Sequence, residues 1–238
     1  MPTSRSSQKP QKKNPLVKKP WKGARSKRLG TSAISPDLAI QLFQRYYPDA
    51  HCALNHRNPY ELLIATILSA QCTDERVNLV TPALFERYPT PQSLAKAKQE
   101  DVETLIRSTG FYKNKAKNLI ACAKDLTQKH QGEVPQKLED LVVLAGVGRK
   151  TANVVLGNSF GIASGVVVDT HVTRLSNRFG WAKSENAIQI EQKLQRIIPE
   201  EHWIMISHWL ISHGRAVCKA RSPRCENCFL QEECPAKV

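Results

Sequence analysis

The sequence predicts an all-α fold. Helix starts recur as a capping residue followed by proline, which suits the first helical position because proline has no amide hydrogen to leave unpaired. Ser35-Pro36, Asn58-Pro59 and Thr90-Pro91 all follow this pattern. The best strand candidate, the valines at 166–168, is too short and isolated to imply a sheet.

The first half of the fold is predicted from helix caps, breakers and end signals. Thr73-Asp74-Glu75 begins one helix, and Pro82 should kink or break it because proline removes a backbone donor and clashes with the preceding turn. Gly110 and Gly132 end later helices. The predicted helices cover residues 36–47, 59–70, 73 onward, 91–97, 100–108 and 113–130.

The second half contains two helical patterns around a glycine hairpin, followed by three more helices. In the first half, by contrast, the predicted helix at 59–70 carries an apolar stripe with the helical spacing of a core-facing surface, formed by Leu62, Leu63, Ile67 and Leu68. The helices of the second half are predicted over residues 138–144, 150–160, 170–179, 185–197 and 201–217.

Length and charge define two unequal parts of the chain. With 238 residues, 41% of them apolar, it can bury a core in one large domain or two small lobes. Its formal charge of +14 is uneven, because residues 1–36 hold ten Lys or Arg and no acid. Residues 1–33 are therefore predicted to be a disordered basic tail, which suits salt-sensitive contact with nucleic acid but also fits a solubilising arm.

Targeting signals are few. No apolar run of 18 residues occurs, and the N-terminus lacks the apolar centre of a secretory signal, so we expect neither a membrane span nor export. The basic, acid-free tail leaves an organelle transit peptide as an alternative.

The segment from Leu144 to Ala152 carries the strongest local signal for binding. Gly146 and Gly148 allow a tight turn and close backbone approach, and the helix that follows offers unpaired amides to an anion such as phosphate. Lys150 lies at that helix start, where the dipole and Arg149 disfavour its charged form and so make it a candidate nucleophile. A solvated surface lysine is the alternative interpretation.

Four cysteines near the C-terminus predict a metal centre. Cys218, Cys225, Cys228 and Cys234 follow the pattern Cys-x6-Cys-x2-Cys-x5-Cys. Four thiolates suit a tetrahedral zinc or a cubane cluster, and the presence of a single close pair favours a [4Fe-4S] cluster. The remaining three cysteines are expected to be small core residues.

Together these motifs give the chain a resemblance to the endonuclease III family of helix-hairpin-helix DNA glycosylases. The resemblance covers roughly residues 34–235 and rests on the hairpin at 145–152, Val168-Asp169-Thr170-His171, Leu68-Ser69-Ala70-Gln71 with Thr73-Asp74, and the cysteine spacing. It implies a two-lobed all-α fold with a C-terminal iron-sulfur cluster loop.

The same resemblance implies a domain division. A bilobal glycosylase domain would cover residues 34–238. A six-helix barrel lobe over about 59–165 would contain the helix-hairpin-helix at 138–160. The second lobe, with the terminal helices and the cluster, would combine about 34–58 with 166–238.

The resemblance also implies a chemistry, namely excision of damaged bases followed by strand cleavage through a lysine Schiff base. Lys150 matches the lysine of bifunctional glycosylase/AP lyases, and Asp169 matches the essential aspartate. From local sequence alone, Asp169 is also explained as a helix N-cap. Oxidised pyrimidines are the substrates expected from the family.

Further residues are expected to contact DNA. Gln71 aligns with a residue that fills the space left by the flipped nucleotide, and Phe111 falls where the family often has a leucine wedge, although a buried core Phe is the alternative. Ala145 also departs from the family's usual proline. The remaining expected contacts are Gly146, Gly148, Arg149 and His171 around the hairpin and the aspartate, and Lys219, Arg221 and Arg224 in the cysteine loop.

Three alternative functions fit parts of the sequence pattern. Adenine- and thymine-specific mismatch glycosylases generally lack a lysine at position 150, and a non-catalytic DNA-binding module would not need both Lys150 and Asp169. The expected partner is double-stranded DNA with damaged bases or abasic sites, bound by a monomer. A cytoplasmic, nucleoid-associated location is expected in a bacterium, and the nucleus or an organelle in a eukaryote.

Overall fold

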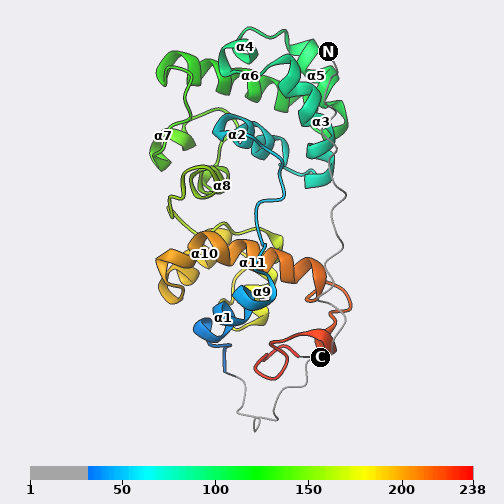
Figure 1. Ribbon diagram of the computed structural model, residues 1–238, viewed down its shortest axis with the longest axis vertical. Helices are drawn as coiled ribbons and strands as arrows, with labels where there is room; N and C mark the ends of the chain where they lie inside the picture. The colour runs from blue at the N-terminus through cyan, green and yellow to red at the C-terminus, as the bar shows by residue number, and fades with distance from the viewer. Residues whose placement is uncertain (1–31, 238) are drawn as a thin grey trace, which may run out of the picture.

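A computed structural model describes residues 32–237, and within that range every regular element is a helix (Figure 1). The predicted all-α class is confirmed, and residues 166–168 form no strand. The predicted tail, residues 1–33, falls almost entirely outside the described range. The α-helices are α1 Pro36–Tyr46, α2 Pro59–Leu68, α3 Asp74–Arg87, α4 Pro91–Ala95, α5 Gln99–Ile106, α6 Tyr112–Lys129, α7 Leu138–Val142, α8 Arg149–Phe160, α9 Thr170–Arg178, α10 Ala187–Ile197 and α11 Trp203–Ala216.

The predicted caps begin helices where the sequence places them. The Asn58 side chain accepts a hydrogen bond from the amide of Glu61, and Thr90 forms a reciprocal capping box with Ser93. Ser35 precedes α1 but makes no side-chain cap bond. The local signal therefore located all three starts, although only two are closed by a side chain.

Of the kink or break predicted at Pro82, the break does not occur, because α3 continues through this residue to Arg87. Proline removes one amide donor from the helix. On either side of it, Val77, Thr81 and Leu84 are buried, and α3 packs against α2 and α5. Tertiary packing of this face therefore holds the helix together across the missing bond.

The first of two hydrophobic cores is built mainly from α2 to α8 (Figure 1). Helix α2 is buried almost all round, as shown by the complete burial of Leu62, Leu63 and Leu68. The long helix α6 contributes a further buried face that includes Leu119 and Leu126. Because α2 is apolar on nearly all sides, it must be surrounded by other helices, and it therefore forms the centre of this half.

The second core joins α1 to the C-terminal third of the chain. Phe43 of α1 is fully buried, stacks on Trp209 and meets Phe229 and His213 edge to face. Edge-to-face and offset aromatic pairs of this kind are favoured by the ring quadrupole. Phe43 therefore connects the start of the described chain to its last segment.

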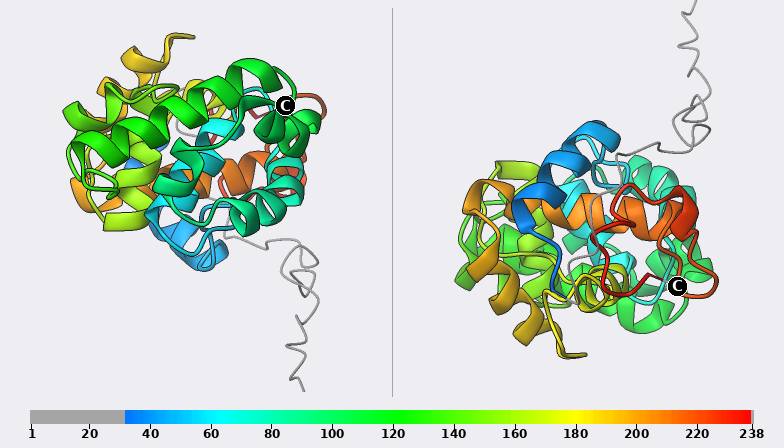
Figure 2. Two further views of the ribbon diagram at one scale, coloured as in Figure 1. Left: turned by 90° about the horizontal axis from the view of Figure 1, so that it is seen from above. Right: turned by 90° about the horizontal axis from the view of Figure 1, so that it is seen from below.

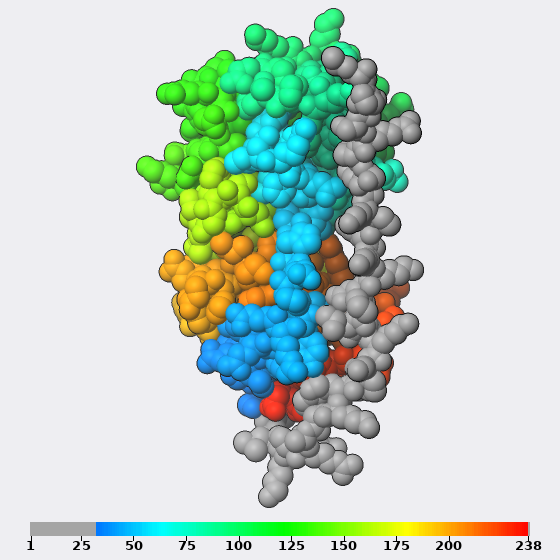
Figure 3. All heavy atoms as spheres, in the orientation of Figure 1, coloured from blue at the N-terminus to red at the C-terminus, as the bar shows by residue number. Residues whose placement is uncertain are grey.

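The two cores lie one above the other along the long axis of the molecule. The views in Figure 2 show α3 to α6 at one end, with α1 and the C-terminal segment at the other. The chain between α1 and α2 runs along one face from one half to the other (Figure 3), and the chain returns between α8 and α9. Leu54, on the first of these connections, already packs in the first core.

Helices α8 and α11 face each other where the halves meet. A Cβ atom added to Gly157 would lie 3.2 Å from a side-chain carbon of Ile204, so glycine permits the close approach of these helices. Within residues 32–237, no helix combines the length and apolar character needed to cross a membrane.

Replacing Phe43 by Ala should lower the free energy of unfolding by about 3 to 5 kcal/mol, because it empties the centre of the second core. Denaturant titration would measure this loss. Leu79→Ala is the matched control, since Leu79 is 70% exposed and its truncation should change stability by less than about 0.5 kcal/mol. Equal effects of the two substitutions would contradict the packing described here.

Candidate active site

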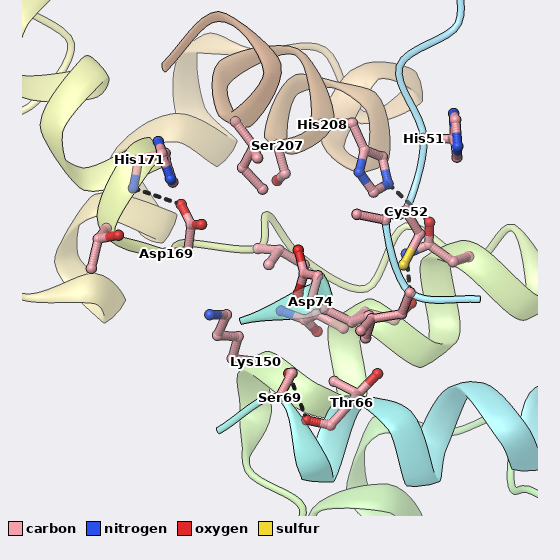
Figure 4. A pocket seen from close by; sticks show the side chains of 18 of the residues that line it. His51, Cys52, Thr66, Ser69, Asp74, Lys150, Asp169, His171, Ser207 and His208 are labelled. Atoms are coloured by element: carbon pink, nitrogen blue, oxygen red, sulfur yellow. Dashed lines mark hydrogen bonds between the residues drawn. The ribbon is translucent and has the colours of Figure 1, made fainter. Parts of the chain in front are cut away.

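A cavity of about 610 Å³ lies between the two halves and is lined by both. Lys150 of α8 and Asp169 at the start of α9 contribute to its wall, as do Gln71 and His171. In Figure 4, Lys150 and Asp169 lie toward one end of the pocket and His208 and Cys52 toward the other. The two predicted catalytic residues, which come from different cores, therefore share one pocket.

The glycine hairpin places Lys150. Helix α7 ends at Val142, and the amide of Val147 donates to the carbonyl of Leu144 to close the turn. Gly146 has a φ of 77°, and an added Cβ would come within 3.1 Å of Asn118, so both its backbone and its surroundings require glycine. Lys150 is the second residue of α8 and is exposed.

Gly148 differs from Gly146. It is the N-cap of α8, with an ordinary extended φ of −96° and nothing within 4 Å of an added Cβ. The fold itself therefore does not require a glycine at position 148. The absence of a side chain leaves the amides at the start of α8 open to an approaching group.

Asp169 is held by the backbone that follows it. Its Oδ1 atom accepts hydrogen bonds from the amides of His171 and Val172, each at 2.8 Å. These bonds make Asp169 the N-cap of α9, as the local alternative predicted. The cap also fixes the orientation of the carboxylate at the edge of the pocket, so a capping role and a role in the pocket are compatible.

The Arg149 side chain, which is 46% exposed, forms an ion pair with Glu191 of α10. Its guanidinium donates to both carboxylate oxygens of Glu191 at 3.0 and 3.1 Å, and Asn153 donates to the same carboxylate. The Glu191 side chain is only 7% exposed. This ion pair compensates the charge of Arg149 and links α8 of the first core to α10 of the second.

Gln71 and Phe111 lie on two exposed turns with unusual backbone geometry. Gln71 has a φ of 52° and Phe111 a φ of 47°, in the left-handed region that non-glycine residues rarely adopt. Phe111 is 65% exposed, so the core alternative for this residue is wrong. Large exposed side chains on constrained turns are suited to meeting a partner.

The far end of the pocket is polar and was not predicted from the sequence. His208 of α11 bonds to the side chain of Asn158 at 2.9 Å, and burial lowers the pKa of His208 to about 4. Asp74 and Arg215 form a second ion pair across the halves at 2.7 Å. At the near end, burial also lowers the pKa of His171, so both histidines favour their neutral forms.

The four cysteines predicted as metal ligands line a second, small cavity of about 20 Å³. Arg178 donates to Sγ of Cys218 at 3.2 Å, and Nε2 of His213 lies 3.3 Å from Sγ of Cys228. Burial raises the pKa of Cys228 to about 12, so this thiol needs a compensating cation to ionise.

Within the described residues, no group of three or more His, Cys, Asp or Glu side chains is arranged to hold one metal ion. Four cysteine thiols that line one cavity are a donor set suited to an iron-sulfur cluster, whose iron atoms are held by cysteine thiolates. The basic residues Arg221 and Arg224 of the same loop are exposed, and Lys219 is partly buried. Arg178 fixes this loop through the carbonyls of residues 219 and 220.

Comparison with known proteins places these sites in a family. Residues 64–200 match the HhH-GPD superfamily of base excision DNA repair proteins, and residues 218–234 match the iron-sulfur binding domain of endonuclease III. Endonuclease III of Synechocystis is 52% identical over 197 residues, covering 83% of this chain and 90% of the relative. The chain belongs to the endonuclease III family.

Other comparisons agree with this membership. Endonuclease III of Escherichia coli K12 is 44% identical over 80% of this chain and 90% of its own length. A solved endonuclease III, trapped as a covalent intermediate with DNA, is 46% identical with a TM-score of 0.80, covering 84% of this chain and 94% of that one. This endonuclease III family member is thus a DNA glycosylase and AP lyase with a [4Fe-4S] cluster.

Removal of the buried Glu191 carboxylate should loosen the contact between the halves of this endonuclease III family member. Glu191→Ala leaves Arg149 and Asn153 without their shared acceptor and should cost about 1 to 3 kcal/mol in unfolding experiments. Asp125→Ala, which breaks an ion pair with a 63%-exposed Lys129, is the control and should cost less than about 0.5 kcal/mol. A Glu191→Ala loss no larger than the control would argue against a structural role for the buried pair.

Proposed function

We propose that Lys150 is the nucleophile and Asp169 the charge-stabilising carboxylate of the glycosylase and lyase reactions. The observation that carries this proposal is their meeting in one pocket, although each belongs to a different half of the molecule. Such a pocket suits a nucleotide that has been rotated out of the duplex, because a base inside the stack is unreachable.

In the first step, the neutral amine of Lys150 attacks C1′ of the deoxyribose. A C–N bond forms, and the glycosidic bond breaks with its electron pair leaving on the base, which takes up a proton. Positive charge develops on the sugar as this bond breaks, and the carboxylate of Asp169 stabilises it. The hydrogen bonds from His171 and Val172 keep that carboxylate oriented toward the pocket.

In the second step, the C1′–O4′ bond breaks and opens the sugar ring, O4′ takes up a proton and the nitrogen gives one up. The Schiff base that forms between C1′ and Lys150 makes a C2′ proton acidic. Removal of that proton and departure of the 3′ phosphate form a C2′–C3′ double bond and break the strand. Water then hydrolyses the Schiff base and frees the amine of Lys150.

The DNA backbone is proposed to rest on the hairpin and on the cysteine loop. The amides at the start of α8, left open by Gly148, suit a phosphate oxygen, and Gly146 maintains the turn that presents them. The exposed Arg221 and Arg224, with Lys219, would supply a second, salt-sensitive contact. His171 would meet the nucleotide at the mouth of the pocket.

Gln71 and Phe111 are proposed to enter the duplex when the nucleotide leaves it. The Gln71 amide both donates and accepts hydrogen bonds, so it can pair with an unpartnered base. The exposed ring of Phe111 can stack against a neighbouring base. The solved endonuclease III–DNA covalent intermediate is described as a complex with an estranged adenine, which supports an insertion role for Gln71 and Phe111.

The proposed ligands of the iron-sulfur cluster are Cys218, Cys225, Cys228 and Cys234, which line one cavity inside the matched domain. When bound, the cluster supplies iron–thiolate bonds that cross-link the C-terminal segment. Arg178 bonds to the sulfur of Cys218 and to loop carbonyls, so this chain's own residues already hold the loop in shape.

We also propose lobe boundaries and a substrate class. The two separate cores support lobes at about 59–165 and at 34–58 with 166–238, although Leu54, on the connection between the lobes, packs in the first core. Oxidised pyrimidines in double-stranded DNA are the proposed substrates, bound by a monomer. The relatives named above are bacterial, which favours the nucleoid as the place of action.

Lys150→Ala should abolish borohydride trapping on abasic DNA and reduce strand cleavage by more than about 100-fold, because Lys150 is the only lysine of residues 32–237 that lines the pocket. DNA affinity should change by less than about threefold, since binding is spread over several contacts. Lys183→Ala, at another exposed lysine outside the pocket, is the control. If the Lys150→Ala variant were still trapped on abasic DNA, a residue other than Lys150 would have to be the nucleophile.

Cys228→Ala should prevent stable cluster incorporation, measured as iron and acid-labile sulfide per chain and as visible charge-transfer absorption. Cys122→Ala is the matched control, because Cys122 is equally buried but lies in the first core, away from the cysteine cavity. Full iron content in the Cys228 variant, or stoichiometric zinc in the unaltered protein, would contradict the proposed ligand set.

A further inference from the structure

Lys115, near the start of α6, is a buried cation whose ammonium bonds to backbone rather than to a carboxylate. The residue is only 5% exposed. Its Nζ atom donates to the carbonyl of Leu68 at 2.8 Å and to the carbonyl of Thr109 at 2.8 Å. Leu68 and Thr109 lie 41 positions apart in the sequence, so a single side chain joins two separate segments.

Both carbonyls lie at the ends of helical segments. Leu68 is the last residue of α2, and Thr109 is the last residue of the 3₁₀ turn Arg107–Thr109. Carbonyls at these positions lack a partner inside the helix and carry the negative end of the helix dipole. They therefore provide a favourable environment for a buried ammonium group that has no carboxylate partner.

Each carbonyl is followed at once by one of the two constrained turns. Gln71 comes three residues after Leu68, and Phe111 comes two residues after Thr109, each with a left-handed φ. Gly110, between Thr109 and Phe111, has a φ of 71°. The bonds of Lys115 are thus made at the bases of the turns that carry Gln71 and Phe111.

Filling space alone does not call for a charged group here, since burying an ammonium group costs free energy. The two bonds of Lys115 offset that cost by satisfying the carbonyls of Leu68 and Thr109. What an apolar side chain could not supply is a pair of directional bonds that fixes one turn relative to the other.

We propose that Lys115 is a positioning residue that holds the Gln71 and Phe111 turns at a fixed separation, so that both side chains enter the duplex together when a nucleotide is extruded. The inference rests on the insertion roles proposed for Gln71 and Phe111. Lys115 itself touches no reacting atom and acts only through these turns.

The test compares two forms of one substrate, an abasic strand alone and the same strand in a duplex. Insertion into a duplex is needed only for the second form, so the ratio of their single-turnover cleavage rates isolates the step assigned to the turns. Lys115→Met keeps the length and removes the donors. It should lower duplex cleavage about 10-fold or more while leaving single-strand cleavage within about twofold.

A spectroscopic readout follows insertion directly. With 2-aminopurine opposite the abasic site, the fluorescence change on binding should be smaller in Lys115→Met than in the unaltered protein. Lys115→Gln retains a donor amide and should give intermediate values in both measurements. If Lys115→Met does not fold, Lys115→Gln replaces it in both measurements.

Ala123→Gly is the matched control, since it weakens the buried face of the same helix but touches neither turn. An equal fall in the duplex to single-strand ratio in Ala123→Gly and the Lys115 variants would reduce Lys115 to a general structural residue. An unchanged ratio in the Lys115 variants would overturn the inference outright.

Gln71→Ala and Phe111→Ala separate this inference from the proposed function. If both lower the duplex to single-strand ratio and the Lys115 variants do not, only the positioning role of Lys115 fails. If neither lowers the ratio, the insertion roles themselves fail, and the inference fails with them.

Discussion

The buried carboxylate of Glu191 is the contact on which the geometry of the active site depends. It accepts hydrogen bonds from Arg149 and Asn153, which flank Lys150 on the first turns of α8, while its own helix belongs to the second core. Asp169 belongs to that same second half. The positions of Lys150 and Asp169 relative to each other are therefore set by polar contacts between the two halves, and loss of such a contact would disturb the pocket before it disturbed either core.

Helix starts provide much of the chemistry. Lys150 lies on the first turn of α8, Asp169 caps α9, and the amides left open at Gly148 face outward. At these positions the backbone has unpaired donors, so it can bind a carboxylate inside the protein or a phosphate outside it. At Asp169 a capping role and the proposed catalytic role are compatible, because the two amide bonds that begin the helix also fix the orientation of the carboxylate.

Sequence reasoning succeeded where the signal was local. Caps such as Asn58 and Thr90, the hairpin glycine Gly146 and the cysteine spacing each depend on a few neighbouring residues. No break occurs at Pro82, where packing outweighed a local penalty, and no pattern in the sequence indicated that Arg149 pairs with Glu191, 42 residues away. Lys115 gave no signal at all, since its partners are backbone carbonyls of distant segments. The sequence thus located the chemical groups, but their support comes from contacts that no short pattern records.

The aromatic cluster around Phe43 has a consequence for the order in which the chain acquires structure during synthesis. The first core is built from one continuous stretch, α2 to α8, and can condense as soon as that stretch has left the ribosome. The second core needs Phe43 from the beginning of the described chain and Phe229 from near its end. Helix α1 therefore stays without its aromatic partners until residue 229 has been synthesised, and the half that carries Asp169 acquires its core after the first half does.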